Sequence, residues 1–466
     1  MSSAVKKEDT YYLPFSEMCQ VYNIEVEYIE QTNRVIVTSL DRKLEMADSA
    51  KDLSVKWKQD IFSRTVDKIK KGEKVVVIST QNNWAKIRTT KGAIGYVKEG
   101  DLANRIIVRE DLERNTKIDG NVSLVWDYYS QYVSAPTREG TKIQGVNVVS
   151  PSFFMLERLG KGAITDNAKS GGESYVNWAK ENGYQVWAIF SNDSMIQTTH
   201  EILSDYKLRE KTINNIISLA IKYKVDGINL DFENMYETDK DLYTRFVAEL
   251  YPRLKEYGMS LSVDVTAPDG SPEWSLCFDR YAISENADYI VFMAYDQYNA
   301  SSTSAGPTAG YDWVKVSLDK FLRDIESEKI ILGIPFYTRI WRENEDGTLS
   351  GEPSVVNMKN TYSVIPNNAT ITWDEARRQN YAEYTQDGKI RKIWIEDEKS
   401  IIEKLNLAIE EKLAGVAFWE KDREDTSIWK IVSEKRQMIL ILALYYIQCY
   451  NRISESKDSV FQAFEV

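Results

Sequence analysis

The chain has 466 residues, more than one ordinary compact domain holds, so we expect at least two domains. Hydrophobic residues at 43% and charged residues at 28% are typical of globular proteins, and a formal net charge of −12 disfavours nucleic acid as a partner because phosphates would repel it. One histidine and three widely spaced cysteines exclude His-based triads, multi-histidine metal sites and a disulfide framework. We therefore expect no metal and no cofactor, and chemistry based on carboxylates or tyrosine.

The first hundred residues are predicted to be rich in β-strands. Residues 34–38 and 74–78 are strand-like apolar runs, and residues 84–88 alternate with period two. Short strands at this spacing predict a small β-domain of their own.

Two segments in this region resemble known modules. Residues 8–50, with Tyr12–Phe15 and Val26–Tyr28, are similar to the stalk module named after copper amine oxidases, which implies no copper here. Residues 55–105, with Asn83–Ile87 and Gly95–Val97, resemble a bacterial SH3-like domain. Domains of that kind often hold enzymes to cell-wall peptides, which implies attachment to a wall. A spacer without any ligand is the alternative interpretation.

From residue 119 the pattern alternates between strands and helices. Helical spacing of apolar residues recurs around 213–220 and 242–254, and again over 400–413. This alternation predicts an α/β fold, a (β/α)8 TIM barrel over 119–432, with a small α+β subdomain inserted over 337–414 between strands seven and eight. Residues 433–466 form a tail without an assigned role, whose apolar run is too short to span a membrane. The eight predicted strands are 122–126, 145–150, 185–190, 227–232, 260–265, 289–295, 330–335 and 415–419.

The fourth of these strands carries the candidate chemistry. Asn229, Asp231 and Glu233 alternate along it and should therefore share the inward face of the barrel, where an apolar filler is the default. An ionised Asp231 would disfavour a second negative charge, so Glu233 would keep its proton and serve as a general acid. Two acids on one strand are poorly placed for the usual two-carboxylate scheme, which leaves a nucleophile supplied by the substrate.

The segment Asp226–Glu233 resembles the DGxxxDxE signature of family 18 glycoside hydrolases, in which Asp226 and Gly227 are structural. The resemblance implies that Glu233 is the acid/base and that Asp231 orients the 2-acetamido group of the sugar, whose carbonyl attacks the anomeric carbon. Residues 293–296 resemble the family's MxYD motif, so Tyr295 would bind the acetamido oxygen. The remaining implied substrate-binding residues are Asn229, Met293, Asp296, Trp419, Trp126, Tyr337 and Arg339.

One departure narrows the substrate. Chitinases usually carry Asp at the position of Asn229, and the Asn form, like residues 333–341, resembles the branch acting on bacterial cell walls and spore cortex. We therefore expect an N-acetylglucosaminidase acting on peptidoglycan, extracytoplasmic, with its export or anchoring segment absent from this chain. A chitinase, an enzyme of N-glycans and a carbohydrate-binding barrel without catalysis remain alternatives. Trp126, Trp187, Trp274 and Trp341 either stack on sugars or pack in the core.

Overall fold

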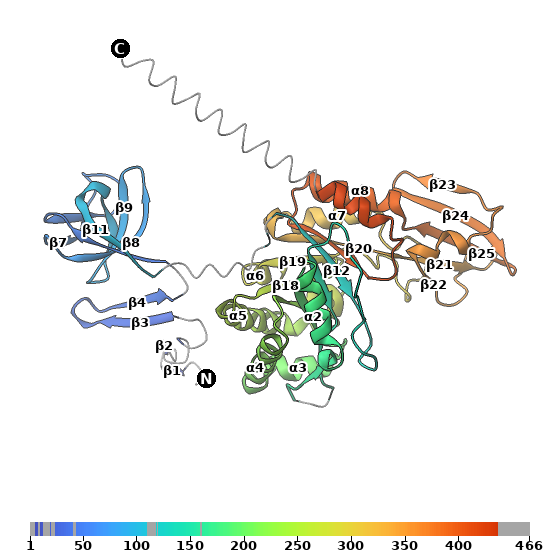
Figure 1. The fold of residues 1–466 in the computed structure, drawn as a ribbon, viewed down its shortest axis with the longest axis horizontal. Coiled ribbons are helices and arrows are strands. Elements are labelled where there is room, and N and C mark those ends of the chain that lie inside the picture. Colours follow the sequence, from blue (N-terminus) through green and yellow to red (C-terminus); the bar gives the residue numbers. More distant parts are fainter. Residues whose placement is uncertain are drawn as a thin grey trace, which may run out of the picture. The chain divides into compact units, whose positions relative to one another are not determined.

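The computed structural model describes residues 5–7, 10–12, 19, 24–40, 43–109, 118, 120–158 and 161–436. The chain divides into two compact units, one ending at Asn115 and the other beginning at Thr116 (Figure 1). The stalk module predicted over 8–50 is described only in part. The tail beyond residue 436, including the apolar run that the sequence contains there, lies outside the described residues.

The N-terminal unit contains a seven-stranded antiparallel sheet with the order β11-β5-β8-β9-β10-β6-β7. Its core is small and apolar, centred on Val55, Ala85, Ile87 and Val97. Gly95 lies where β10 pairs with β6. A Cβ at this position would approach the Lys56 carbonyl oxygen to 2.5 Å, so only glycine fits. The strands are β5 (Leu44–Ser49), β6 (Leu53–Lys56), β7 (Thr65–Ile69), β8 (Lys74–Gln81), β9 (Trp84–Thr89), β10 (Ile94–Lys98) and β11 (Leu102–Arg109).

Two hairpins precede this sheet. Strands β3 (Ile24–Ile29) and β4 (Arg34–Ser39) pair with each other, as do β1 (Val5–Lys7) and β2 (Thr10–Tyr12). The three strand segments predicted for this unit fall within β4, β8 and β9.

The second unit is built on a closed barrel of eight parallel strands, which confirms the predicted fold. Strand β17 ends at Asp231, so Glu233 lies two residues beyond it, and the predicted second strand begins three residues later than expected. The barrel strands are β12 (Val122–Asp127), β13 (Val148–Pro151), β16 (Gln185–Ser191), β17 (Gly227–Asp231), β18 (Ser260–Val265), β19 (Tyr289–Met293), β20 (Ile330–Pro335) and β26 (Gly415–Trp419).

Helices cover the outside of the barrel, because each of the longer ones carries an apolar stripe that packs on the strands. Helix α4 begins where the Asp205 carboxylate accepts from the Leu208 amide, and α8 begins with a reciprocal cap between Asp397 and Ser400. The helices are α2 (Gly172–Glu181), α3 (Ile196–Ser204), α4 (Tyr206–Tyr223), α5 (Lys240–Glu256), α6 (Arg280–Ser284), α7 (Tyr311–Phe321) and α8 (Glu398–Glu410).

The segment between β20 and α8 forms a five-stranded antiparallel sheet with the order β22-β21-β25-β24-β23. The predicted turn at 386–388 joins β24 to β25. Apart from its strands, the described segment between β20 and α8 contains 3₁₀ helices at Met358–Asn360 and Tyr362–Val364 and no α-helix. The strands are β21 (Tyr337–Glu343), β22 (Ser354–Asn357), β23 (Ile371–Asp374), β24 (Gln379–Gln386) and β25 (Lys389–Ile395).

The interior of the barrel changes character along its axis. An apolar layer that includes Leu124, Trp187 and Val291 fills most of it. Toward the carboxyl ends of β17 and β18 the inward positions instead hold Asn229, Asp231 and Asp264, which packing alone does not require. The polar end of the barrel is therefore where a site is expected.

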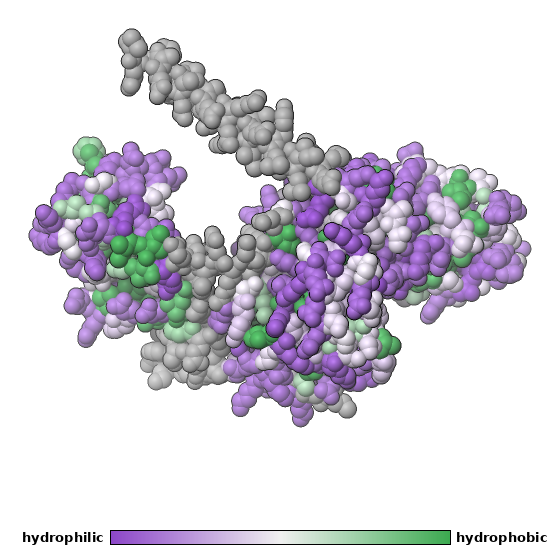
Figure 2. All heavy atoms as spheres, viewed as in Figure 1, coloured by the Kyte–Doolittle hydropathy of each residue, from purple (hydrophilic) through white to green (hydrophobic). Residues whose placement is uncertain are grey.

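On the face seen in Figure 2, the described residues of both units are mainly hydrophilic, with hydrophobic patches on the N-terminal unit and smaller ones on the second unit. None of the helices in the described residues is long and apolar enough to cross a membrane.

Candidate active site

Glu233 and Asp231 lie together at the carboxyl end of β17. Burial raises the pKa of Asp231 to about 6, a value already lowered by its hydrogen bond with Glu233. Burial, then the negative charge and the hydrogen bond of Asp231, raise the pKa of Glu233 well above its ordinary value. The geometry thus favours a protonated Glu233 donating to an ionised Asp231 near neutral pH.

The main chain of Glu233 is held by a side chain of the neighbouring strand. Asn192 follows the last residue of β16, is buried, and donates from Nδ2 to the Glu233 carbonyl oxygen at 2.7 Å. Its Oδ1 accepts from the Glu233 N–H at 3.0 Å, and its Nδ2 also lies 2.9 Å from the hydroxyl of Thr199. The Asn192 side chain therefore makes the two main-chain hydrogen bonds at Glu233 that a neighbouring strand would make if β17 continued. Asn192 was not predicted from the sequence, because nothing in its local pattern distinguishes it from a loop residue.

Asn229 is fully buried and makes four hydrogen bonds. Its Oδ1 accepts from Trp126 Nε1 at 2.7 Å and from the Ser150 hydroxyl at 3.3 Å. Its Nδ2 donates to the Ser262 hydroxyl at 2.9 Å and to the carboxylate of Asp264 at 2.6 Å. These partners fix which end of the amide faces which strand.

The burial of Asn229 and Trp126 corrects two predictions. Both were expected to contact substrate, but Asn229 has no exposed surface and Trp126 is only 1% exposed. Because a sugar cannot reach either side chain, their contribution is to orient other groups. Trp126 packs edge-on against Tyr295 and Trp419, with ring centroids 6.4 and 5.7 Å apart.

Asp264 is a third carboxyl group at this end of the barrel, and it was not predicted from the sequence. Burial, followed by the charge of Asp231, raises its pKa well above the ordinary range. Within the described part of the chain, no ion pair joins Asp231, Glu233 or Asp264 to a basic side chain. A signal was present, because Ser260, Ser262 and Asp264 alternate along one strand as Asn229 and Asp231 do on the next.

The residues after β19 form a second part of the site. Asp296 accepts from the Tyr337 hydroxyl at 2.6 Å and from Arg339 Nη2 at 2.7 Å, so strand β21 of the inserted sheet fixes its carboxylate. Tyr295 packs edge-on against Tyr337, and burial, then the charge of Asp264, raises its pKa well above the ordinary value. Met293 ends β19 and is buried. The structure therefore brings four of the predicted residues, Tyr295, Asp296, Tyr337 and Arg339, into one cluster.

Aromatic rings border the ends of β12 and β26. Trp419 is half-buried and lies 6.1 Å from the ring of Tyr128, which is 57% exposed. Of the other tryptophans considered, Trp187 and Trp341 are fully buried and pack in the core, whereas Trp274 is 42% exposed. Trp419, Tyr128 and Trp274 therefore keep ring surface exposed for a sugar face.

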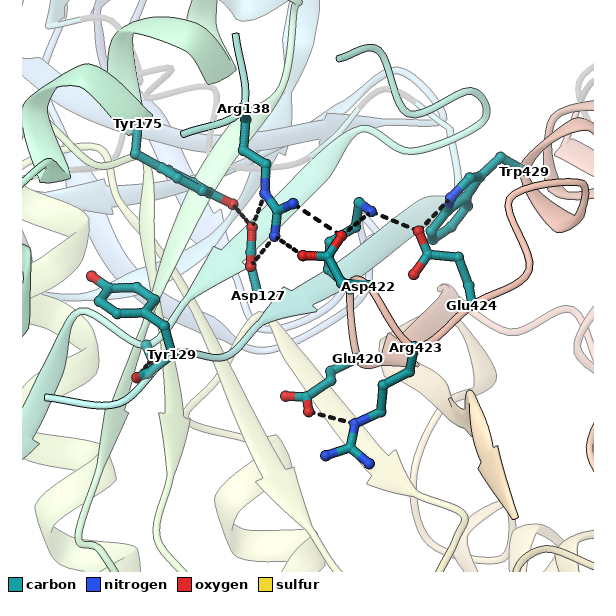
Figure 3. A network of polar contacts seen from close by, with 11 residues as sticks. Asp127, Tyr129, Arg138, Tyr175, Glu420, Asp422, Arg423, Glu424 and Trp429 are labelled. Atoms are coloured by element: carbon teal, nitrogen blue, oxygen red, sulfur yellow. Dashed lines mark hydrogen bonds and ion pairs between the residues drawn. The ribbon is translucent and has the colours of Figure 1, made fainter. Parts of the chain in front are cut away.

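A polar network holds the segment that follows Trp419 (Figure 3). The Arg138 guanidinium bridges Asp127, at the end of β12, and Asp422, with N···O distances of 2.7 and 2.8 Å. Lys421 then joins Asp422 to Glu424, and Glu424 accepts from Trp429 Nε1 at 3.0 Å. The first and eighth strands of the barrel are thereby tied together next to Trp419.

Asp226 and Gly227 lie at the opposite end of β17 and are structural. The Asp226 carboxylate accepts from the Val186 amide at 2.9 Å. A Cβ at position 227 would approach both the Ser260 carbonyl oxygen and the ring of Trp187 to 2.8 Å, so glycine allows the strands to close. In the described residues, no group of three or more His, Cys, Asp or Glu side chains is arranged to hold a metal ion.

Comparison with protein families gives two matches. Residues 125–424 match the model described as glycosyl hydrolases family 18, and residues 58–103 match the bacterial SH3 domain. Neither match extends to residues 8–50, where the stalk module stays a prediction from the sequence.

Several curated relatives come from Bacillus. The uncharacterized glycosylase YvbX of Bacillus subtilis is 26% identical over 297 residues, which are 62% of this chain and 84% of that protein. The cortical fragment-lytic enzyme of Bacillus subtilis is 25% identical over 245 residues, which are 51% of this chain and 56% of the enzyme. The chain thus spans about half the length of that second relative.

Solved structures share the fold. A chitinase from Chromobacterium violaceum superposes with a TM-score of 0.60 at 22% identity, covering 68% of this chain and 99% of the chitinase. The Bacillus cereus spore cortex-lytic enzyme SleL gives 0.58 at 17% identity, covering 83% of this chain and 97% of the enzyme.

Proposed function

The chain belongs to the glycosyl hydrolases of family 18, and on this premise we propose that it hydrolyses the glycan strands of bacterial peptidoglycan at N-acetylglucosamine residues. The observation that carries the proposal is the hydrogen-bonded pair of Glu233 and Asp231 at the polar end of the barrel. The cortical fragment-lytic relatives support a wall polymer over chitin.

In the proposed mechanism Glu233 is the acid that starts the reaction. It transfers its proton to the glycosidic oxygen while the acetamido carbonyl oxygen of the same sugar bonds to the anomeric carbon, and the glycosidic C–O bond breaks. Asp231 carries the negative charge that stabilises the acetamido N–H in the resulting oxazolinium ion. Water then attacks the anomeric carbon as the Glu233 carboxylate takes its proton, and the ring opens with retention of configuration.

Other residues bind and orient the sugar in this proposal. Tyr295 donates a hydrogen bond from its phenol to the acetamido oxygen. Because the pKa of Tyr295 is raised, the phenol keeps its proton and remains a donor. Asp296, fixed by Tyr337 and Arg339, accepts from a sugar hydroxyl. Trp419 forms the floor of the sugar subsite, and Met293 lines it.

The substrate is tested by offering purified peptidoglycan, chitin oligomers and an N-glycosylated protein to the full chain. We expect new reducing ends from peptidoglycan, carried by N-acetylglucosamine in mass spectra. Cleavage of chitin alone would favour the chitinase alternative, which the fold neighbour from Chromobacterium violaceum makes the second candidate. Cleavage of none would support a binding protein without catalysis.

The mechanism is tested separately with a substrate from which the N-acetyl groups have been removed. Without the acetamido carbonyl there is no internal nucleophile, so turnover should disappear. Equal cleavage of the acetylated and deacetylated forms would rule out assistance by the substrate. Glu233→Gln should retain binding but lose about 10²–10⁴-fold in kcat, whereas the exposed Glu237→Gln should behave as the wild type.

The N-terminal unit is proposed to hold the enzyme to the wall, outside the cytoplasm. The match to the bacterial SH3 domain supports this role. Three exposed hydrophobic side chains on the loop between β6 and β7, Trp57, Ile61 and Phe62, supply a surface for it.

A further inference from the structure

The site contains one more carboxyl group than the proposed mechanism uses. Asp264 is 1% exposed and occupies the last inward position of β18, one inward position beyond Ser262, which is the register partner of Asn229 on β17. Its carboxyl group accepts from Asn229 Nδ2 at 2.6 Å, the shortest of the four hydrogen bonds that Asn229 makes. Asp264 is therefore hydrogen-bonded to an uncharged amide, while the charges of Asp231 and Glu233 act on it directly.

Among the described residues, the groups facing Asp264 give it no positive partner. Asp231 and Glu233, at the end of β17 and just beyond it, are acids. Of the nearby phenols, Tyr243 on α5 is buried and Tyr295 after β19 is half-buried. The remaining neighbour, Trp126 on β12, supplies only a neutral N–H. Three negative charges in this space without a cation would be strongly unfavourable, so the site must retain protons on some of its acids.

The hydrogen bonds indicate which acid remains neutral. Asn229 gives one N–H to Asp264 and the other to Ser262. The Trp126 N–H and the Ser150 hydroxyl donate to the Asn229 oxygen, so Asp264 receives few donors. An acid at position 229 would instead accept from Trp126 Nε1 and the Ser150 hydroxyl, which now donate to the Asn229 oxygen. The Ser262 hydroxyl could also turn to donate to it. Few donors favour the protonated carboxyl, and many donors favour the ionised one.

We propose that Asp264 is a positioning residue of the active site that holds its proton while the enzyme works, so that Asp231 is the one ionised acid among Asp231, Glu233 and Asp264 in the resting site. The inference rests on the proposed function for its kinetic tests. In this arrangement Asn229 and Asp264 together determine the pH at which Asp231 becomes charged, and the hydrogen bond from Asn229 to Asp264 fixes the orientation of the amide.

The first test replaces Asp264 alone. Because Asn is a neutral replica of the protonated acid, Asp264→Asn should lose only about two- to fivefold in kcat/KM and leave the acid limb of the pH profile near 6. Asp264→Ala leaves the Asn229 N–H without its acceptor and should lose about tenfold or more. A fall of the limb by more than about half a pH unit in Asp264→Asn would overturn the proposal, since it would mean that a charge had been removed.

The second test exchanges the two residues. In the double variant Asn229→Asp/Asp264→Asn the hydrogen bond between the strands is kept with reversed polarity, so the fold should be retained. The acid at 229 now accepts from Trp126, Ser150, Ser262 and the new amide, and should be ionised. A second charge beside Asp231 should move the acid limb upward by about one pH unit or more. An unchanged limb in the folded double variant would contradict the proposal.

A readout that needs no substrate separates this inference from the proposed function. Infrared spectra of the ligand-free protein at pH 7 should contain the carbonyl bands of two protonated carboxyls, Glu233 and Asp264, and Asp264→Asn should lose the band of Asp264 while keeping that of Glu233. If the Asp264 band is lost but no N-acetylglucosamine polymer is cleaved by the wild type, the proposed function fails and the charge state of Asp264 stands. If the polymer is cleaved and the bands are the same in both proteins, only the inference fails. Thermal unfolding of each variant shows that it is folded.

Discussion

At the residue scale, the ionised carboxylate of Asp231, which the proposed reaction needs, lowers the free energy of unfolding. Its pKa is raised from 3.8 to about 6 in the folded protein, so between these values the native state holds a proton that the unfolded chain has released. Stability therefore falls as the pH rises through this window, and the cost is fully present above pH 6. This cost is on the order of 2–3 kcal/mol, because a pKa difference of one between the folded and unfolded states corresponds to about 1.4 kcal/mol.

Asp231→Asn removes this cost together with the reaction. We expect the variant to unfold at a higher temperature than the wild type at pH 7–8, to match it near pH 4, and to lose hydrolysis at every pH. Thermal unfolding followed by circular dichroism from pH 4 to 8 measures the difference. A variant less stable than the wild type at pH 8 would mean that Asp231 is not ionised against its surroundings.

Asn192 is predicted to act on turnover rather than on binding. Removing its amide releases both hydrogen bonds to the Glu233 main chain, so the acid loses its direction while the sugar contacts near Asp296 and Trp419 remain. Asn192→Ala should lower kcat about 10- to 100-fold with little change in KM. Initial rates over a range of substrate concentrations separate the two constants, and a rise confined to KM would contradict the assignment.

At the element scale, the Arg138 bridge ties the first barrel strand to the segment after the eighth. The side chains of Arg138 and Asp127 are 10% and 3% exposed, so removing the cation leaves a buried carboxylate without its partner. Arg138→Met should cost about 3 kcal/mol of unfolding free energy and raise KM, because Trp419 adjoins the same segment. Lys430→Met, which removes an exposed ion pair with Glu434, is the matched control and should change stability by less than about 0.5 kcal/mol. Equal losses of unfolding free energy in the two variants, measured by urea unfolding, would show that the Arg138 bridge stabilises the fold no more than an exposed ion pair does.

The sequence was informative where a residue's chemistry conflicts with its place in a strand. The eight barrel strands followed from apolar alternation, and Glu233 with Asp231 followed from acids at inward positions. Trp126 was misjudged because sequence does not reveal whether an indole faces solvent or a buried amide. Asn192 was missed because its role depends on a neighbouring strand, which only the closed barrel brings close to it. Asp264 alternates with two serines along its strand, but its contact with Asn229 also becomes visible only in the closed barrel.

At the scale of the whole molecule, the N-terminal unit exposes hydrophobic side chains on the loop between β6 and β7. Phe62 is 89% exposed and Ile61 is 57% exposed, yet the loop is ordered by its own hydrogen bonds, including Phe62 N–H to Asp60 Oδ1 at 2.9 Å. Arg64 stacks over Trp57, with its guanidinium carbon 4.5 Å from the ring centroid. A fixed apolar tip loses little entropy on binding, so it suits attachment to a wall polymer.

Phe62→Ser should therefore weaken sedimentation of the full chain with purified cell-wall sacculi by about fivefold or more, since a buried aromatic contact contributes about 1 kcal/mol or more. Hydrolysis of small soluble glycan fragments should be unchanged, because the catalytic residues belong to the other unit. Ile94→Ser, which removes a 48% exposed side chain from β10 of the same domain, is the control and should sediment as the wild type does. If both variants bind sacculi like the wild type, the loop is not the attachment surface, and if only hydrolysis of fragments falls, the two units do not act independently.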